Sequence, residues 1–520
     1  MINKKKLPLL LIILDGWGLN KKFRGNAIVQ AETPNFDLLC KKYSFTKLNA
    51  SGKYVGLPHK QVGNSEAGHM NISSGFVVLQ DNIIIDNSIK NGIFFKNNIF
   101  LQSIKHINKN KSDINLIGLL SGNSSTHSSK NHIISLINLF LNNTNKIVYL
   151  HLFTDGRDSR MFSSSEILSD ILSNFDKRRV KVASIMGRFY AMDRKKSWER
   201  IKLAYELLVL GKGIFAENGI KAIKQAYNRG ESDEFILPTI ITKNKKVIKT
   251  INDNDAIIFF NLRSDRARQL TKVLVQKDFN KNNFNSFKRI KKLKNIFFIA
   301  LTDFGKDLEN VLTAFPGVSI PNTLVNVLVN IRQLYIAETE KYAHVTYFFN
   351  GGYDKKINTE DRLSLASVDV PSYDKKPTMT TELLTKKVIN FIKNNKYDFI
   401  TLNIASPDMV AHTGNLKASI EAVEIVDKCL GKIIKVMNSF NGTTIITSDH
   451  GNIEEMIYYD TGEIRTEHTN NLVPFIIIDK KYNYKLKNGG KLANITPTIL
   501  DILNINKPKS MKAKSLIIKK

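Results

Sequence analysis

The chain has 520 residues, of which 42% are hydrophobic and 24% are charged, and its formal net charge at pH 7 is +30. This composition excludes a wholly disordered or collagen-like chain and allows a large core. At roughly 150 residues per domain, the length predicts about two to four domains. Two cysteines, Cys40 and Cys429, are too few for a disulfide framework, so we expect a reducing, cytoplasmic location.

The positive charge is spread along the chain. Lysines occur in short groups such as Lys195-Lys196 and Lys291-Lys292, among many Asn and Ile residues, without a basic stripe interleaved with aromatic residues. Lys, Asn and Ile are residues that AT-rich codons specify, which favours a solvated surface of drifted composition. We therefore expect no specific nucleic-acid partner, although non-specific binding of polyanions at low salt follows from the charge alone.

The N-terminus combines Lys4 to Lys6 with an apolar run at residues 7–14. This run is too short to cross a bilayer, which takes about 20 residues. It ends at Asp15-Gly16 instead of a small-residue cleavage site. A buried first strand that ends in a functional turn is the better interpretation, and no other segment predicts a membrane partner.

Further along the chain, short apolar runs alternate with helix-like stretches. The runs occupy residues 9–14, 147–153, 256–260, 399–404 and 443–447, and the helix-like stretches occupy residues 164–175, 197–210, 381–394 and 418–438. This alternation predicts an α/β fold of mostly parallel sheets flanked by helices. In such folds the functional groups lie at the carboxyl ends of the strands.

Residue types that bind metals lie near the start of the chain and in its last quarter, whereas the middle third carries arginine-rich segments. This distribution predicts two domains, each large enough for its own core. The first would be discontinuous and comprise residues 1–80 and 316–520. The second would be inserted and comprise residues 81–315.

Two pairs of candidate metal ligands follow predicted strands. Asp408 and His412 are four residues apart, a spacing that places both on one face of a helical turn. Asp449 and His450 are neighbours, and in an extended chain they would point to opposite faces. Both can serve one site only where the chain turns, which Gly451 permits.

Asp15 and His468 add a carboxylate and an imidazole. Oxygen and nitrogen ligands without thiolates suit Mn²⁺, Mg²⁺ or Zn²⁺. Each residue alone also has an ordinary explanation as a solvated pair or a helix cap. A binuclear metal site is therefore one interpretation of their joint occurrence.

Residues 63–69, Gly-Asn-Ser-Glu-Ala-Gly-His, contain a candidate nucleophile. Ser65 could lie at a helix start, where free N–H groups and the helix dipole favour a phosphate. The alternative is that Ser65 is merely an N-cap. The spacing is not that of the G-x-S-x-G elbow, but a serine without an adjacent base can still attack where a metal lowers its pKa.

Together these motifs make the chain resemble the cofactor-independent (2,3-bisphosphoglycerate-independent) phosphoglycerate mutases of the alkaline-phosphatase-like superfamily. The resemblance runs nearly from end to end. Its most specific parts are residues 187–194, Gly-Arg-Phe-Tyr-Ala-Met-Asp-Arg, and residues 261–268 and 337–346.

The resemblance implies two Mn²⁺ ions per chain, with Mg²⁺ or Co²⁺ as substitutes. One ion would be held by Asp408, His412 and His468, and the other by Asp15, Ser65, Asp449 and His450. Ser65 would be transiently phosphorylated, and Lys341 would offset the charge of the transferred phosphoryl group.

The resemblance also implies a substrate site in the inserted domain. Five arginines would bind phosphoglycerate, namely Arg157, Arg188, Arg194, Arg263 and Arg266. An ordinary ion pair with Asp193 or Asp265 is the alternative role for any one of them. Asp158 and His127 would transfer protons to and from the glycerate hydroxyls.

The implied activity interconverts 3-phosphoglycerate and 2-phosphoglycerate in a monomer, without 2,3-bisphosphoglycerate. The alternatives are a metal-dependent phosphatase and a basic nucleic-acid-binding protein. The sequence departs from the family pattern at residues 121–129, where Ser-Gly-Asn-Ser-Ser-Thr-His-Ser-Ser replaces Ser-Asp-Gly-Gly-Val-His-Ser-His. His127 and all presumed metal ligands remain, so we expect a working enzyme in which the loop at residues 122–125 could weaken substrate retention.

Overall fold

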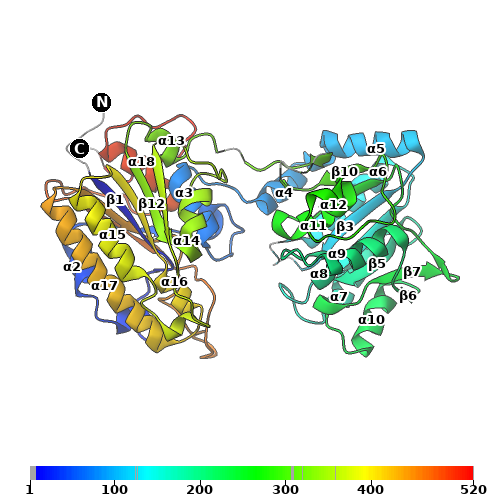
Figure 1. Ribbon diagram of the computed structural model, residues 1–520, viewed down its shortest axis with the longest axis horizontal. Helices are drawn as coiled ribbons and strands as arrows, with labels where there is room; N and C mark the ends of the chain where they lie inside the picture. Colours follow the sequence, from blue (N-terminus) through cyan, green and yellow to red (C-terminus); the bar gives the residue numbers. More distant parts are fainter. Residues whose placement is uncertain are drawn as a thin grey trace. The chain divides into compact units, whose positions relative to one another are not determined.

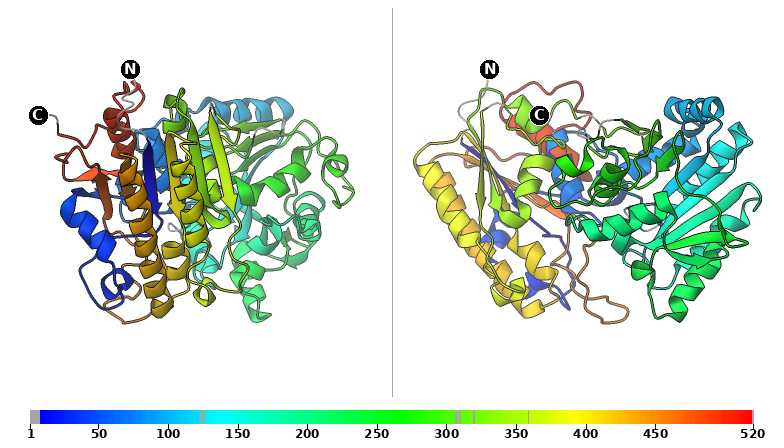
Figure 2. Two further views of the ribbon diagram at one scale, coloured as in Figure 1. Left: turned by 60° about the vertical axis from the view of Figure 1, so that its left-hand side comes forward. Right: turned by 45° about the vertical axis from the view of Figure 1, so that its right-hand side comes forward.

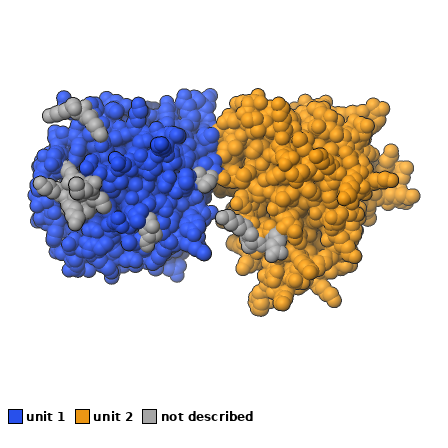
Figure 3. All heavy atoms as spheres, turned by 90° about the horizontal axis from the view of Figure 1, so that it is seen from above, with its two compact units in different colours: residues 1–80, 318–520 blue, residues 81–317 orange. Residues whose placement is uncertain are grey.

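The computed structural model describes residues 8–518, with gaps at 123–124, 126, 306–307, 309, 319 and 358. The chain divides into two compact units, which Figures 1 and 3 display. Unit 1 comprises Met1–Gln80 and Val318–Lys520, and unit 2 comprises Asp81–Gly317. The chain therefore returns to unit 1 after residue 317, whereas the sequence placed the return after residue 315.

Unit 1 contains a mostly parallel sheet of eight strands in the described part of the chain. β1 lies between β14 and β15 and is parallel to both, whereas β16 is antiparallel to its neighbours β15 and β2. In spatial order the strands are β13 (Glu360–Leu365), β12 (Gln333–Glu338), β14 (Phe399–Ile404), β1 (Leu9–Leu14), β15 (Thr443–Thr447), β16 (Val473–Ile478), β2 (Ser44–Asn49) and β17 (Gly490–Lys491).

Polar and apolar residues do not alternate along the apolar runs, and strand β1 shows the reason. All six of its residues are buried. Leu9, Leu11 and Ile13 pack into one hydrophobic cluster, and the alternate residues pack into a second cluster. Both faces of the sheet are thus covered, which is the usual condition of a central parallel strand.

Helices cover both faces of this sheet (Figure 2). The cluster that contains Leu10 also receives apolar side chains from α1 (Ala27–Gln30), α2 (Pro34–Lys42), α15 (Thr381–Lys393) and α17 (Leu416–Ser439). The cluster that contains Leu9 receives side chains from α3 (Ser65–Ser74), α13 (Leu324–Val327) and α18 (Ile495–Ile502). Two short helices, α14 (Thr339–Ala343) and α16 (Ser406–Ala411), follow β12 and β14.

Unit 2 has a second mostly parallel sheet, in which β5–β7 and β7–β8 are the antiparallel pairs among the described strands. The spatial order is β11 (Val311–Thr313), β10 (Phe297–Ala300), β9 (Ala256–Phe259), β3 (Ile114–Leu120), β4 (Val148–Thr154), β5 (Val180–Gly187), β7 (Thr239–Lys243) and β6 (Ile214–Ala216), with β8 (Lys246–Val247) paired to β7 alone.

The sheet of unit 2 is also covered on both faces. One cluster includes residues of α4 (Asp81–Lys90), α5 (Asn98–Asn110), α6 (Lys130–Asn143), α7 (Ser164–Ser173) and α10 (Gly219–Asn228). The other includes residues of α8 (Arg188–Ala191), α9 (Trp198–Tyr205), α11 (Ser264–Val275) and α12 (Phe279–Asn282).

The predicted fold class is confirmed: both units are α/β, with mostly parallel sheets between helices. The runs at 9–14, 399–404 and 443–447 are strands with these same bounds. The helix predicted at 197–210 is shorter, because α9 ends at Tyr205 and a π-helical turn follows at Glu206–Leu210. In the described part of the chain, no helix is long and apolar enough to cross a membrane.

Candidate active site

Ser65 is the first residue of α3, and Asn64 caps this helix. The Asn64 side chain accepts a hydrogen bond from the backbone N–H of Ala67 at 2.9 Å. The interpretation of Ser65 as the N-cap is therefore wrong, because the N-cap is Asn64. The Ser65 hydroxyl is left available at the positive end of the helix dipole.

The Ser65 hydroxyl is buried and meets three side chains from distant parts of unit 1. Lys341 Nζ donates to Ser65 Oγ at 2.8 Å, and His450 Nε2 lies 3.0 Å from the same oxygen. Ser65 Oγ donates to Asp15 Oδ1 at 3.4 Å. The structure therefore brings Ser65, Lys341, His450 and Asp15 together in one cluster.

Lys341 follows strand β12 and lies among carboxylates. Its Nζ is 2.7 Å from Asp15 Oδ1 and 2.6 Å from Asp408 Oδ2. Burial alone would lower the pKa of Lys341, but the carboxylates of Asp15, Asp408 and Asp449 outweigh this effect and raise it. Lys341 is thus a fixed ammonium ion beside the Ser65 hydroxyl.

Asp408, His412 and His468 form a compact group of ligand types. Each histidine Nε2 lies 3.4 Å from Asp408 Oδ1, and the two Nε2 atoms are 3.1 Å apart. His412 Nδ1 lies 2.7 Å from the backbone oxygen of Thr466, and His468 Nδ1 lies 2.8 Å from that of Gly63.

These contacts fix the tautomer that each imidazole has in its metal-binding, neutral form. A carbonyl oxygen only accepts, so each Nδ1 must carry the proton and each Nε2 must present a lone pair. The two lone pairs and Asp408 Oδ1 then face one another. Asp408 Oδ1 also accepts a hydrogen bond from Asn452 Nδ2 at 2.7 Å, but neither Nε2 has a described donor. Converging acceptors of this kind fit a cation, and backbone carbonyls bonded to the other ring nitrogen are the usual support for metal-bound histidines.

Asp15, Asp449 and His450 form an adjoining buried group. His450 Nε2 is 3.4 Å from Asp449 Oδ2 and 3.6 Å from Asp15 Oδ1, so the two neighbouring ligands do face one site. Gly451 follows this pair and does not have a positive φ. A Cβ there would lie 2.3 Å from Thr469 Oγ1, so it is space that requires glycine.

The charges of this region also favour cations. Asp15, Asp408 and Asp449 are all buried, and Lys341 is the only ammonium or guanidinium ion for which ion pairs with them are described. Burial lowers the pKa of His450 to about 3, so this imidazole stays neutral. Burial and Asp449 raise the pKa of Asp15 to about 6. Buried carboxylates in excess of their cationic partners are stabilised by bound metal ions.

His69 is a member of this site that the sequence interpretation missed. Its Nδ1 lies 2.9 Å from the backbone oxygen of Ser65 and 3.3 Å from Asp449 Oδ2. Its Nε2 lies 3.0 Å from Asn403 Nδ2, which also donates to Asp15 Oδ2 at 2.7 Å. The signal was the spacing of four residues between Ser65 and His69. Asn403, within a buried strand, had no such signal.

In unit 2 the predicted substrate residues gather around Arg188, which follows β5. Arg188 Nη1 donates to Asp155 Oδ1 at 2.5 Å and to Asp158 Oδ2 at 2.8 Å. His127 Nε2 lies 3.8 Å from the same Asp158 oxygen. Burial and Arg188 lower the pKa of His127 to about 4, so this histidine is neutral near pH 7. Positions 123, 124 and 126 of the altered loop lie outside the described residues.

The remaining arginines lie near this group. Burial and the nearby charges of Arg188 and Arg194 lower the pKa of Arg266, and Arg263 acts in the same way on His127. Arg157 pairs with Glu234 at 3.3 Å. Arg194 pairs with Asp265 at 3.4 Å, as the ion-pair interpretation predicted, whereas Asp193 pairs with Arg200. Several like charges close together favour an anionic ligand.

Comparisons with known proteins agree with this geometry. The model of the metalloenzyme superfamily matches residues 7–507. The 2,3-bisphosphoglycerate-independent phosphoglycerate mutase of Clostridium kluyveri is 45% identical over 515 residues, which covers 98% of this chain and 99% of the relative. A second such mutase, from Methanosarcina acetivorans, is 46% identical over 520 residues, with 98% of this chain and 99% of the relative covered.

A solved structure gives the same assignment. The phosphoglycerate mutase of Leishmania mexicana, in a crystal structure at low cobalt concentration, superposes with a TM-score of 0.75 and is 29% identical. The match covers 99% of this chain and 98% of that one. With its buried serine, its convergent metal-ligand types and these full-length relatives, the chain belongs to the family of 2,3-bisphosphoglycerate-independent phosphoglycerate mutases, within the metalloenzyme superfamily.

Proposed function

We propose that this chain interconverts 3-phosphoglycerate and 2-phosphoglycerate through a phosphoserine at Ser65, with two Mn²⁺ ions and without 2,3-bisphosphoglycerate. The observation that carries the proposal is the buried Ser65 hydroxyl, which lies 2.8 Å from Lys341 Nζ and 3.0 Å from His450 Nε2. A structural serine has no need of a buried ammonium ion, whereas a phosphoryl acceptor does.

The residues of unit 1 fit the two metal ions. Asp408, His412 and His468 would hold one ion, and Asp15, Ser65, Asp449 and His450 would hold the other. The bound ions would supply Lewis-acid stabilisation of the serine oxygen and of the phosphoryl oxygens. The facing Nε2 lone pairs of His412 and His468, and the excess of buried carboxylates, support this assignment.

Ser65 and Lys341 would perform the phosphoryl transfer. Ser65 Oγ attacks the phosphorus atom in line with the departing glycerate oxygen, and the P–O bond to glycerate breaks as the bond to Ser65 forms. The Ser65 hydroxyl loses one proton in this step and the departing glycerate oxygen gains one, so the step leaves a glycerate hydroxyl and no net change in protons. Lys341 stays protonated in its carboxylate surroundings, so it offsets negative charge on the phosphoryl oxygens. The N-terminus of α3 adds its dipole to the same task.

The residues of unit 2 would bind phosphoglycerate and return its protons. Arginine suits carboxylate and phosphate groups because its planar fork forms paired hydrogen bonds. Asp158 and the neutral His127 can accept the proton of the glycerate hydroxyl that takes the phosphoryl group back from Ser65. Because donor and acceptor are the same molecule, no bisphosphorylated primer is needed.

The test is a ³¹P NMR assay with metal-stripped protein, 3-phosphoglycerate and no 2,3-bisphosphoglycerate. We expect 2-phosphoglycerate to form only after Mn²⁺ is added, and Ser65→Ala to abolish its formation. Ser74→Ala, at the other end of the same helix, is the matched control and should keep the activity.

The same spectra distinguish the alternatives. Inorganic phosphate in place of 2-phosphoglycerate would identify a phosphatase, because water would then be the acceptor of the phosphoryl group. No conversion with Mn²⁺, Mg²⁺ or Co²⁺ in a folded sample would overturn the proposal.

A further inference from the structure

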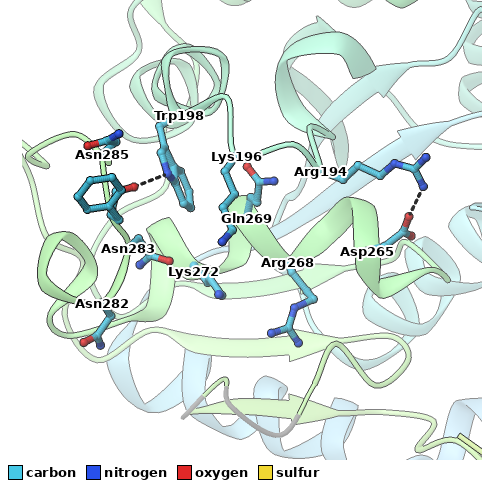
Figure 4. A pocket seen from close by; sticks show the side chains of 11 residues that line it. Arg194, Lys196, Trp198, Asp265, Arg268, Gln269, Lys272, Asn282, Asn283 and Asn285 are labelled. Atoms are coloured by element: carbon cyan, nitrogen blue, oxygen red, sulfur yellow. Dashed lines mark hydrogen bonds and ion pairs between the residues drawn. The ribbon is translucent and has the colours of Figure 1, made fainter. Parts of the chain in front are cut away.

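Glu454 is a buried acidic residue of unit 1 that the proposed phosphoryl transfer does not use. Its side chain is fully buried, and it follows His450 by four residues. In unit 2, by contrast, Asp265 pairs with Arg194 at the surface, where the Asp265 side chain is 46% exposed (Figure 4). A carboxylate stays inside a protein only where hydrogen bonds compensate for its lost hydration, so the partners of Glu454 indicate its role.

Both carboxylate oxygens of Glu454 accept hydrogen bonds from neutral groups. Oε2 accepts from the backbone N–H of Gly18 at 2.9 Å and from that of Asn452 at 2.8 Å. Oε1 accepts from Asn471 Nδ2 at 2.9 Å and from the Thr469 hydroxyl. The Thr469 hydroxyl itself accepts from the backbone N–H of Asn471 at 3.2 Å, so its proton is directed at Glu454. These donors oppose the rise in the pKa of Glu454 that burial causes.

The four donors belong to three separate segments of the chain, and each segment also carries proposed metal ligands. These segments are residues 15–18 with Asp15, residues 449–452 with Asp449 and His450, and residues 468–471 with His468. Asn452 extends the connection to a further ligand, because its Nδ2 donates to Asp408 Oδ1 at 2.7 Å. One carboxylate thus joins segments that supply ligands to both proposed ions.

Two glycines provide the space for this carboxylate. A Cβ atom on Gly18 would lie 2.2 Å from Glu454 Cδ, and one on Gly451 would lie 2.5 Å from Glu454 Oε1. Two of the segments that carry ligands therefore lack a side chain where they approach Glu454. This close approach lets backbone N–H groups hold the carboxylate, and such contacts fix the path of the chain itself.

We propose that Glu454 is a positioning residue that fixes both metal sites at once. It holds the three segments in one arrangement through its four hydrogen bonds. It does not bind an ion itself, because each of its oxygens already accepts from two donors. The inference rests on the proposed function, since it concerns the ligands of the proposed Mn²⁺ ions.

The test is a titration of the metal-stripped full chain with Mn²⁺, in which electron paramagnetic resonance measures free Mn²⁺. Urea unfolding of the same metal-stripped samples measures stability. Glu454→Gln keeps the shape of the side chain but replaces an acceptor oxygen with an amide NH₂ group that faces donors. We expect the Kd of both Mn²⁺ ions to rise by about 10–100-fold, the range for groups that orient metal ligands.

Thr469→Val is a milder variant of the same network. It keeps the shape of the side chain and removes one donor to Glu454, so it should raise the Kd for Mn²⁺ several-fold. Combined with Glu454→Gln it should add little, because both changes break one network. If Glu454→Gln does not fold, Thr469→Val decides alone, and an unchanged Kd in it would overturn the inference.

Glu360→Gln is the matched control. Glu360 is another buried glutamate of unit 1, and it accepts from the backbone N–H of Ile357 and from Arg362 Nη2, both at 2.7 Å. It lies at the start of β13, at the opposite end of the parallel strands from the ligands. Glu360→Gln should lower the free energy of unfolding and leave the Kd for Mn²⁺ unchanged.

The outcomes separate this inference from the proposed function. An unchanged Kd in folded Glu454→Gln, or an equal rise in Glu360→Gln, would make Glu454 a packing residue and overturn the inference alone. Failure of the unaltered chain to bind two Mn²⁺ ions would refute the proposed metal sites, and the inference with them.

Discussion

The two candidate sites of this chain differ in how their charged groups are held. In unit 1 the groups that we propose to react are buried and touch one another, as Lys341 does with Ser65, Asp15 and Asp408. In unit 2 Arg157 and Arg194 are 57% and 58% exposed, and each pairs with an acidic side chain. The first site is preorganised for charge that develops during a reaction, whereas the second must exchange ion pairs for a ligand.

Arg188 differs from Arg157 and Arg194 because it is buried. Its side chain is only 3% exposed and lies between Asp155 and Asp158. A buried arginine with two carboxylate partners cannot be removed without leaving charge unpaired. We therefore expect Arg188 to serve the stability of unit 2 as well as the binding of substrate, and the exposed arginines to serve binding alone.

The largest effect is expected for Lys341→Met, which keeps the length of the side chain and removes its charge. The variant should lose turnover by about a thousandfold or more, because the charge beside the Ser65 hydroxyl is then missing. Lys375→Met, at an exposed lysine paired with Asp374, is the control. Turnover measured at saturating 3-phosphoglycerate and Mn²⁺ checks this, and near-normal turnover in Lys341→Met would mean that unit 1 does not depend on its fixed charge.

Arginine-to-lysine substitutions test the difference between buried and exposed arginines in unit 2. Arg188→Lys should raise KM and also lower the free energy of unfolding by about 2–4 kcal/mol, because it disturbs a buried pair. Arg194→Lys should raise KM by about tenfold with little change in stability. Urea unfolding and steady-state kinetics separate the two effects. Equal stability of both variants would contradict the structural role of Arg188.

His69 tests whether the surroundings of the metal ligands are preorganised. His69→Gln removes the contacts with the Ser65 carbonyl and Asp449 and should raise the Mn²⁺ concentration for half-maximal activity by about 10–100-fold. His106→Gln, in α5 of unit 2, is the control. Activity and thermal melting are both measured against free Mn²⁺ concentration. An unchanged Mn²⁺ requirement would make His69 a packing residue only.

The smallest effect concerns His127 and pH. Its folded-state pKa is about 4 against an ordinary value of 6.5, so between these values the unfolded chain binds more protons. The free energy of unfolding that this group contributes is therefore present above pH 6.5 and lost as the pH falls toward 4. Between pH 7 and pH 5, the free energy of unfolding should therefore fall by about 1–2 kcal/mol less in His127→Asn than in the unaltered chain. Urea unfolding at pH 7 and pH 5 measures this fall for both proteins. An equal fall in the variant and in the unaltered chain would refute the lowered pKa of His127.

Much of the fold could be predicted because the central strands are uninterrupted apolar runs. Residues 9–14 are all apolar, so the run was expected to be buried. Helices on both faces of the sheet explain why every position is apolar. The metal-ligand types were recognisable because Asp15, Asp408 and Asp449 come directly after or soon after such runs. Family motifs then added Lys341 and the arginines, whose individual positions no periodicity reveals.

The parts that were missed depend on contacts between distant segments. Asn403 lies inside a buried strand, and only the fold places it against Asp15 and His69. Gly451 is explained by Thr469 and Glu454, which approach it too closely for a Cβ atom. The ion pairs of Arg188 join residues that follow two neighbouring strands. Such side-chain geometry is set by packing and leaves no pattern in a single sequence.

The most direct test of the central claim is to locate the phosphoryl group on the enzyme. The Mn²⁺-loaded chain would be mixed with 3-phosphoglycerate, quenched in acid within the first turnovers, digested and mapped by mass spectrometry. Phosphate on Ser65, formed before 2-phosphoglycerate accumulates and absent after Ser65→Ala, is the predicted result. Formation of 2-phosphoglycerate by the Ser65→Ala variant, or phosphate on a different residue, would contradict the account.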